Sequence, residues 1–400
     1  MRTNTLALLL RDTRNYLQAQ LAVRIPGIYC PSLFGHYGVN STCNLRCSYC
    51  YVHEPETYPK GFAEHGLPLE QARRVLEHLR EECFSIRFQG GEPLLYPHIV
   101  ELARYAREEL RFRNLSIITN GLPLARHPEK YRDLLRHLDI VTLSIDGTRF
   151  NEYPDEMAEL VAFLPALKTM CAETRTGLTS NYTATWEELA DPGQIERRIL
   201  QYQQWIPYFY IMPVRKVGKT PLPLLRSAQV LGRKYSLGFY GGPDYPAVEN
   251  VKWYRKHCNP KLKIKAMADG GLLYPCENHS GTIGSLVDHS IRELWTKELA
   301  AFPNASCIGC GKQRFRLQAF RRPDRQALFL WKKWRGTLDW SATRIPIFHA
   351  PASAVSSGPK GPHYTCCVRV VQAFRPAIRA PSPRFVTFSA PAWFIPLEQT

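Results

Sequence analysis

Three cysteines stand close together in one short segment: Cys43, Cys47 and Cys50. Their spacing of four and three residues lets all three thiols reach a single metal centre from one loop. Thiolates are soft ligands that select zinc or iron–sulfur clusters over magnesium or calcium. Because a [4Fe–4S] cluster has four irons, three cysteines would leave one iron without a protein ligand and open to chemistry. A zinc knuckle and three unrelated buried thiols are the alternative interpretations.

A second cysteine set lies later in the chain. Cys258 and Cys276 flank the segment Asp269-Gly270-Gly271, which is typical of a hairpin turn that would bring the two thiols together. Cys307 and Cys310 form a CxxC pair that would complete a four-thiolate site. Both an auxiliary iron–sulfur cluster and a closed structural zinc site fit this ligand set. The remaining cysteines have no partner at ligand spacing and are expected to be buried thiols: Cys30, Cys83, Cys171, Cys366 and Cys367.

Apolar periodicity alternates between the helical and the strand pattern from residue 36 to about residue 215. Strands are predicted at 36–40, 85–89, 115–119, 140–145, 178–183 and 208–214. Helices are predicted at 6–21, 72–79, 99–110, 131–138, 157–171 (where Pro165 would introduce a kink) and 194–204. Strands that alternate with helices in this way predict a parallel sheet with right-handed crossovers.

Short polar segments follow the first four predicted strands. They are the cysteine loop, Gly90-Gly91-Glu92-Pro93, Thr119-Asn120-Gly121 and Asp146-Gly147. In βα-barrels the carboxyl ends of the strands carry the active site, so these segments are expected to meet at one mouth. Gly90 and Gly91 permit a close backbone approach, and Glu92 can accept a hydrogen bond from an ammonium group.

The CxxxCxxC spacing, with an aromatic residue before the last cysteine, resembles the signature of the radical S-adenosylmethionine (SAM) enzymes. Gly90-Gly91-Glu92-Pro93 follows at a suitable distance and resembles the GGE motif of that family. The resemblance covers about residues 36–215. It implies a partial (β/α)6 TIM-like barrel, a [4Fe–4S] cluster on the three cysteines, and SAM bound to the open iron through its amino and carboxylate groups.

The resemblance also implies roles for individual residues. Gly90-Gly91-Glu92 would approach the amino group of SAM, and Tyr49 would border the adenine. Ser144 and Asp146, at the end of the fourth strand, are candidate ribose contacts. A capped turn is an equally weighted interpretation of these two residues.

The second cysteine set resembles the start of the SPASM auxiliary-cluster domain. Arg314, Phe315 and Arg316 stand where a further thiol of a complete domain would be expected. The closer match is therefore the truncated twitch form, with one auxiliary [4Fe–4S] cluster held by Cys258, Cys276, Cys307 and Cys310 in a small α+β domain.

Charge is distributed unevenly along the chain. The whole sequence carries a net charge of +17, and residues 312–400 account for +12 of it. Basicity therefore belongs to the C-terminal region and does not indicate a nucleic-acid surface on the barrel. Twelve cysteines, no apolar run of ~20 residues, and no small-residue cleavage site before Arg11 favour a cytoplasmic metalloprotein.

Composition then divides the chain into parts. A linker rich in proline and glycine separates the two cysteine regions. The last 60 residues hold nine prolines and one acid, which favours disorder. We expect an N-terminal helical segment (1–35), a core barrel (36–215), a linker (216–250), an auxiliary domain (251–311), a basic aromatic helix (312–340) that docks on the barrel or on an anionic surface, and a disordered tail (341–400).

By the resemblance, the chain would be a radical SAM oxidoreductase or maturase. An electron from a donor such as flavodoxin or ferredoxin would cleave SAM to a 5′-deoxyadenosyl radical, which abstracts hydrogen from a peptide or a small molecule. The auxiliary cluster would transfer electrons. Radical addition to a lipid is one alternative. A cluster-dependent RNA-binding or RNA-modifying protein is another, suggested by the basic aromatic region but opposed by the absence of a recognisable RNA-binding module.

Overall fold

The structure is a computed structural model, and it describes residues 5–24, 29, 31–50, 52, 63–213, 238–239, 263–273 and 282–299. Some of the predictions fall outside these ranges. They concern the basic helix at 312–340, the disordered tail at 341–400 and these cysteines: Cys30, Cys258, Cys276, Cys307, Cys310, Cys366 and Cys367.

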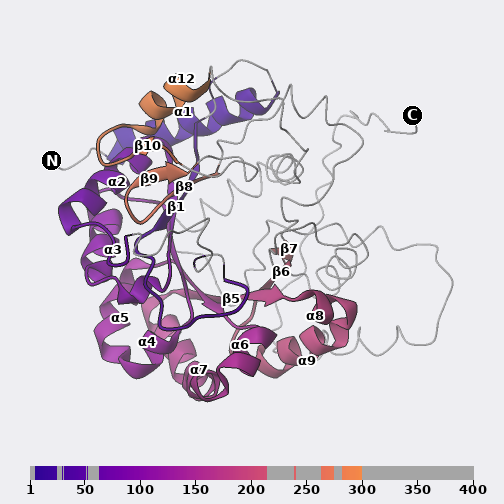
Figure 1. Cartoon of the computed structure of the whole chain (residues 1–400). Coiled ribbons are helices and arrows are strands. Elements are labelled where there is room, and N and C mark those ends of the chain that lie inside the picture. The colour runs from indigo at the N-terminus through magenta and orange to yellow at the C-terminus, as the bar shows by residue number, and fades with distance from the viewer. Residues whose placement is uncertain are drawn as a thin grey trace, which may run out of the picture. The chain divides into compact units, whose positions relative to one another are not determined.

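One continuous sheet forms the centre of the described structure (Figure 1). Its strands are β1 (Phe34–Gly38), β2 (Ser85–Gln89), β3 (Asn114–Thr119), β4 (Ile140–Ser144), β5 (Gly177–Ala184), β6 (Phe209–Pro213), β7 (Gly238–Phe239), β8 (Lys263–Ala266), β9 (Gly271–Leu273) and β10 (Thr282–Ser285). The spatial order is β10-β9-β8-β1-β2-β3-β4-β5-β6-β7. Strands β1 to β6 pair in parallel in sequence order. The predicted α/β class with a partial βα-barrel is therefore confirmed.

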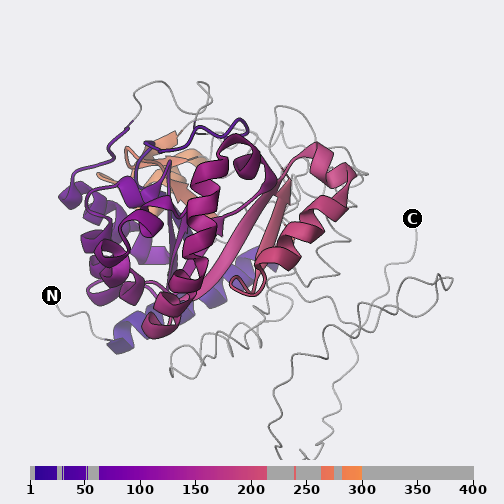
Figure 2. The ribbon, with the colours of Figure 1, turned by 90° about the horizontal axis from the view of Figure 1, so that it is seen from below.

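Helices surround this sheet, and the longer helices of the barrel lie side by side on its outer face, as Figures 1 and 2 show. They are α1 (Thr5–Arg24), α2 (Leu69–Glu82), η2 (Pro93–Leu95), α3 (Ile99–Glu108), α4 (Leu122–Arg126), α5 (Pro128–His137), α6 (Gly147–Glu152), α7 (Pro154–Thr174), α8 (Trp186–Ala190), α9 (Pro192–Tyr202) and α12 (Ile291–Leu299). None of the described helices is long and apolar enough to cross a membrane.

The predicted helices of the barrel bury the apolar faces that their spacing indicated, whereas the N-terminal helix α1 leaves most of its leucines exposed. In α2, for example, the buried positions include Ala72, Val75, Leu76 and Leu79. Helix α7 runs without interruption through Pro165. Cys83 and Cys171 are buried free thiols, as expected. The short helices α4, α6 and α8 escaped prediction because five or six residues are too few to show a helical period.

Helix α1 packs at the amino-terminal end of the sheet. Its buried Asp12 carboxylate pairs with Arg80 near the end of α2 and with Arg113 just before β3, at 2.7 and 2.6 Å. Asn15 donates to the backbone carbonyl oxygens of Glu81 and Glu82. These contacts leave the opposite end of the sheet, where the strands end, for the polar segments.

Strands β8 and β9 form the predicted hairpin. Ala266 pairs with Leu272 in antiparallel fashion. The turn between them needs a left-handed residue, and Gly270 supplies it with a φ of 83°. The hairpin turn expected at Asp269-Gly270-Gly271 is confirmed.

Both edges of the six-stranded parallel core carry added strands. Strand β8 pairs in parallel with β1, and β7 pairs in parallel with β6. These strands come from segments that were expected to form the auxiliary domain and the linker. An open sheet edge leaves backbone donors and acceptors unpaired, and an added strand satisfies them. The domain boundaries themselves stay predictions.

Candidate active site

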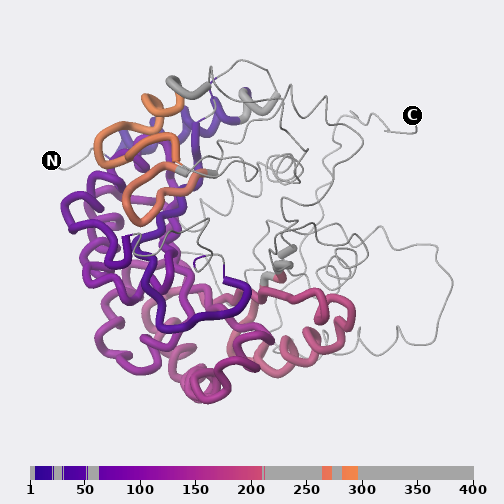
Figure 3. The backbone as a smooth tube through the Cα atoms, viewed as in Figure 1, coloured from indigo at the N-terminus to yellow at the C-terminus, as the bar shows by residue number. Residues whose placement is uncertain are grey.

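The cysteine loop leaves β1 and crosses toward α6, as the indigo trace in Figure 3 shows. The N–H of Arg46 donates to Tyr153 Oη at 2.7 Å, and the N–H of Ser48 donates to Glu152 Oε2 at 3.1 Å. The loop is thus fixed at both ends, by β1 on one side and by the α6–α7 junction on the other.

The three thiols of the loop are free, with no disulfide between them. Cys47 is buried, and Cys43 and Cys50 are half-buried. Cys43 Sγ accepts from the N–H of Leu45 at 3.4 Å. Among the described residues, no three His, Cys, Asp or Glu side chains converge on one metal ion. An iron–sulfur cluster does not require such convergence, because each thiolate binds a different iron.

Gly90 and Gly91 bring the segment after β2 against the backbone that leads into the cysteine loop. The N–H of Gly91 donates to Asn40 O at 2.9 Å. A Cβ on Gly91 would lie 2.2 Å from Thr42 O, and one on Gly90 would lie 2.4 Å from Asn40 O. These two glycines are therefore required by close contacts within the chain, and their approach to SAM stays a prediction.

Glu92 is buried between the segments that follow β2 and β3, with 1% of its surface exposed. Its Oε1 accepts from Thr119 Oγ1 at 2.7 Å and from the N–H of Leu94 at 3.1 Å. Its Oε2 accepts from the N–H of Asn120 at 2.7 Å. Burial raises the pKa of Glu92 to about 7, against these hydrogen bonds. Direct contact with an ammonium group stays a prediction, since protein donors surround this carboxylate.

Asn120 connects Glu92 to the cysteine loop. Its Nδ2 donates to Asn44 Oδ1 at 2.8 Å and lies 3.9 Å from Cys43 Sγ. Its Oδ1 accepts from the N–H of Leu122 at 3.0 Å. The sequence placed Asn120 at the mouth but assigned it no role. The only signal was its position directly after a strand.

Asp146 joins the other side of the cysteine loop to α6. It is fully buried and caps the helix by accepting from the N–H of Arg149 at 3.2 Å. Asp146 is thus a helix cap, and its contact with a ribose stays a prediction. The carboxylate also accepts from Tyr49 Oη at 2.7 Å and pairs with the Arg149 guanidinium. Ser144 is buried at the last position of β4.

Sequence reasoning missed Arg149. Its side chain is 12% exposed, and its guanidinium lies 5.4 Å from the centre of the Tyr49 ring. Burial raises the pKa of Cys47 to about 11, and the Arg149 charge acts in the opposite direction. Burial likewise raises the pKa of Cys43 to about 12. Both thiols must therefore release a proton when they bind metal.

The segment after β5 contacts the segment after β4. Thr185 and Glu188 form a capping box at the start of α8. The Glu188 carboxylate packs against Gly147, where an added Cβ would lie 1.9 Å from Glu188 Oε1. Gly147 follows the capping Asp146 directly, so this contact fixes the turn that presents Asp146 to Tyr49.

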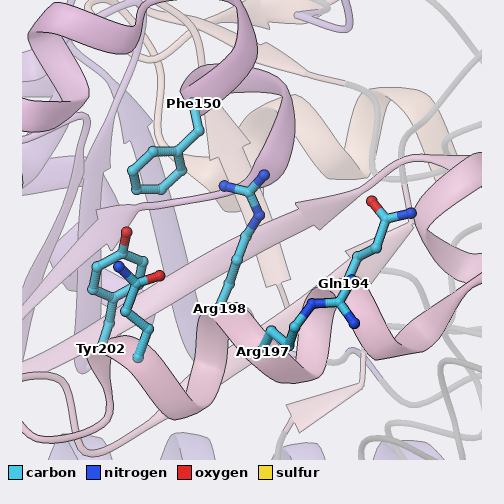
Figure 4. Close-up of a pocket in the computed structure, with 6 residues that line it drawn as sticks. Phe150, Gln194, Arg197, Arg198 and Tyr202 are labelled. Atoms are coloured by element: carbon cyan, nitrogen blue, oxygen red, sulfur yellow. The ribbon is translucent and has the colours of Figure 1, made fainter.

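A surface hollow of about 450 Å³ lies between α6 and α9 (Figure 4). In it, Phe150 stacks on Tyr202 with ring centres 5.5 Å apart, and the Arg198 guanidinium lies 4.8 Å from the centre of the Phe150 ring. The hollow is a gap between side chains of these two helices, and none of the three loop cysteines lines it. Its aromatic stack anchors α6, the helix that Asp146 caps. The lining residues are Phe150, Gln194, Arg197, Arg198, Gln201 and Tyr202.

Comparisons with known proteins agree with this geometry. Residues 38–170 match the family described as the Radical SAM superfamily. The chain is 32% identical over 117 residues to the GTP 3′,8-cyclase of Klebsiella pneumoniae (strain 342), which is 28% of this chain and 35% of that protein. It is 34% identical over 118 residues to the S-adenosylmethionine-dependent nucleotide dehydratase of Danio rerio, which is 28% of this chain and 30% of that protein.

The fold is also similar to that of a solved structure. Streptococcus suis SuiB, crystallised with S-adenosylmethionine, superimposes with a TM-score of 0.50 and 17% identity over 74% of this chain and 75% of that one. The chain spans about a third of the length of the curated relatives it matches. The residues matched by the family model include the cysteine loop, Glu92 and Asp146. Over residues 38–170, this chain carries a domain of the radical SAM superfamily.

Proposed function

We propose that this chain is a radical SAM enzyme in which Cys43, Cys47 and Cys50 hold a [4Fe–4S] cluster and SAM occupies the iron that has no thiolate. One observation carries the proposal. The loop with the three cysteines lies at the carboxyl ends of parallel strands and is enclosed by the segments after β2, β3 and β4. This is the end of a βα-barrel where active sites form.

The residues at this mouth fit both groups. Three thiols provide one ligand for each of three irons. Two buried polar atoms, the acceptor Asn40 Oδ1 and the donor Arg149 Nε, have no hydrogen-bond partner among the described residues. SAM carries an ammonium that donates and a carboxylate that accepts, so it could satisfy groups of both kinds.

When bound, the cluster and SAM together would supply a 5′-deoxyadenosyl radical that abstracts hydrogen from a substrate. The chain's own residues would hold these groups in place. Glu92 and Asn120 fix the segment around Cys43, since they connect it to β2 and β3. Asp146 fixes the ring of Tyr49 beside Cys50, and the Tyr49 ring would border the adenine. Ser144 and Asp146 remain the proposed ribose contacts.

For the substrate we propose a peptide or a small molecule, with an auxiliary [4Fe–4S] cluster on Cys258, Cys276, Cys307 and Cys310 for electron transfer. The support for the auxiliary cluster is the spacing of these cysteines. Nucleotides are a second candidate substrate class, because two of the relatives are named for reactions of GTP and of nucleotides.

The test of the barrel site uses anaerobically reconstituted full-length protein. We expect 5′-deoxyadenosine from SAM and a reductant, and we expect Cys43→Ala, Cys47→Ala and Cys50→Ala each to abolish it, because two thiolates cannot hold the cluster. Cys171→Ala is the matched control, since it removes a buried thiol far from the loop along the chain. Full SAM cleavage by any of the three loop variants would show that its thiol is not a ligand.

The auxiliary site is tested by the double variant Cys307→Ala/Cys310→Ala. We expect it to lose about half of the iron, to keep SAM cleavage and to lose product formation. Stoichiometric zinc in anaerobically purified wild-type protein would instead identify a structural zinc site and remove the electron-transfer role.

A further inference from the structure

Helix α1, at the edge of the described structure, leaves large apolar side chains exposed (Figures 1 and 2). Five of its leucines have between 44% and 61% of their surface exposed: Leu6, Leu9, Leu10, Leu17 and Leu21. Elsewhere in the described part of the chain, only Leu95 and Leu200 are exposed large apolar residues. Single exposed leucines need no explanation, but several of them on one helix mark an interaction surface.

Most of these leucines lie on the side of α1 that faces away from the barrel. The helix packs through its other face, whose buried positions are Leu8, Asp12, Asn15 and Ala19. With 3.6 residues per turn, that face is centred about 180° around the helix axis from the row formed by Leu6, Leu10, Leu17 and Leu21. The core therefore does not need this leucine row, which extends about 22 Å along the helix.

The exposed surface around the leucine row is basic. The single acidic residue of α1, Asp12, is buried and paired with two arginines of the barrel. Arg14 is exposed, and Arg111 donates to the first turn of the helix. Glu81, at the end of α2, contacts the buried face of α1, because its carbonyl oxygen accepts from Asn15. Helix α1 itself thus places positive charge and no negative charge beside the leucine row.

This charge distinguishes between the possible occupants of the leucine row. Arg14 lies at the middle of the row, so a second copy of the chain in a two-fold pair would bring Arg14 against its own equivalent. The C-terminal region, with a charge of +12 over residues 312–400, would also bring like charge. A membrane surface with anionic lipids instead provides an apolar layer for the leucines and negative charge for the arginines.

We propose that the leucine row of α1 binds the surface of a membrane that contains anionic lipids. The helix would lie in the plane of the interface, with its leucines in the boundary between headgroups and acyl chains. Because Asp12 pairs with Arg113 just before β3, α1 lies at the amino-terminal end of the sheet, opposite the mouth with the cysteine loop. Binding through α1 would thus leave that mouth open, and the inference does not depend on the proposed function.

The test measures hydrogen exchange of the reconstituted full-length protein in the presence of vesicles. Vesicles of phosphatidylcholine with phosphatidylserine are the probe, and vesicles of phosphatidylcholine alone are the control. We expect anionic vesicles to slow exchange in peptides from residues 5–21 at about a tenth of the lipid concentration that neutral vesicles require. Reading the exchange peptide by peptide separates α1 from the basic C-terminal region, whose charge alone attracts anionic lipids.

Leucine variants then test the apolar contribution by vesicle sedimentation. Leu10→Gln/Leu17→Gln keeps the helix propensity and should raise the lipid concentration for half-maximal binding about tenfold. Leu10→Met/Leu17→Met keeps the apolar surface and should bind as the wild type does. Leu200→Gln removes an exposed leucine from α9 and is the matched control, which should leave binding unchanged.

A charge variant tests the anionic component separately. Arg14→Gln should raise the concentration of anionic lipid for half-maximal binding about fivefold and should leave binding to neutral vesicles unchanged. Arg136→Gln, at an exposed position on α5, removes an equal charge and should change neither.

Three results would overturn the proposal. They are protection confined to residues 312–400, equal binding by the wild type and Leu10→Gln/Leu17→Gln, and lipid-independent protection of residues 5–21 that grows with protein concentration. The last result would identify a second copy of the chain as the occupant. Iron content and 5′-deoxyadenosine formation should be the same in every variant, so they report separately on the proposed function. If a leucine variant loses its iron, it has misfolded, and Arg14→Gln with the wild-type protection pattern decides.

Discussion

Two buried carboxylates flank the cysteine loop, and they are compensated in different ways. Glu92 is held by a hydroxyl and two backbone N–H groups, all of them uncharged. Asp146 is held by the Arg149 guanidinium, with Tyr49 Oη as a further donor. Burial is nearly complete for both carboxylates. Neutral hydrogen-bond donors therefore surround the Glu92 carboxylate, whereas a full positive charge pairs with the Asp146 carboxylate.

The difference determines how each side responds to change. Hydrogen bonds from neutral donors offset only part of the desolvation of Glu92, so its pKa is raised to about 7 and its charge is sensitive to pH near neutrality. The Asp146 carboxylate depends on a single arginine. Replacing Arg149 would therefore leave a buried charge without a counter-charge and lower the free energy of unfolding. We expect the Glu92 side to be sensitive to pH and the Asp146 side to be sensitive to mutation.

The largest effect is expected for Arg149→Leu, which leaves Asp146 buried without its cation. We expect the free energy of unfolding to fall by about 3–5 kcal/mol, as measured by urea denaturation of the metal-free protein. Arg126→Leu is the control, because it breaks the exposed pair with Glu159 and should cost no more than about 1 kcal/mol. Equal costs in the two variants would show that Arg149 and Asp146 do not depend on each other.

The next effect concerns pH and compares the wild type with Glu92→Gln. Folded Glu92 keeps its proton up to about pH 7, whereas unfolded Glu92 loses it at about 4.5. The folded state thus binds more protons between these values, and wild-type stability falls relative to the variant as pH rises from 4.5 to 7. The decrease should total about 3 kcal/mol and then level off. A difference that stays constant across this range would mean that Glu92 titrates normally.

The smallest effect is expected for Tyr49→Phe, which removes one hydrogen bond to Asp146. Because the acceptor is a carboxylate, we expect a cost of about 2 kcal/mol in thermal or urea denaturation. Tyr131→Phe is the matched control, since its buried hydroxyl donates to a backbone carbonyl oxygen, that of Leu94, at 2.8 Å. That variant should lose about 1 kcal/mol. The reverse order would indicate that the Tyr49 bond adds nothing beyond a neutral one.

Much of the fold followed from local pattern. The bounds of β2 were predicted to the residue, and every predicted strand lies within about two residues of an observed one. Alternation within a strand and the i, i+3, i+4 spacing in a helix are properties of neighbouring residues, so the sequence displays them directly. Strand β7 has two residues, too short to show any period, and nothing local marks it.

The cysteine loop and the GGE segment were also predicted, because their spacing is distinctive. What the sequence could not show is the set of contacts between segments that lie far apart in the chain. Two of the three donors to Glu92 come from residues 27 and 28 positions later, and Tyr49 donates to a residue 97 positions later. An arginine three residues after a helix cap usually faces solvent, so nothing marked Arg149 as buried.

The pairing of β2 with its neighbours has a consequence for how this protein can change during evolution. Arg87 and the adjacent Phe88 point to opposite faces of the sheet, and Phe88 lies in the core with the helices. Deleting a single residue inside β2 would exchange the two faces, placing a phenylalanine inside the barrel and an arginine among the apolar side chains. Insertions and deletions should therefore be excluded from this strand. Within this strand, side chains on the face opposite the core can change only by substitution at every second position, which are Ser85, Arg87 and Gln89.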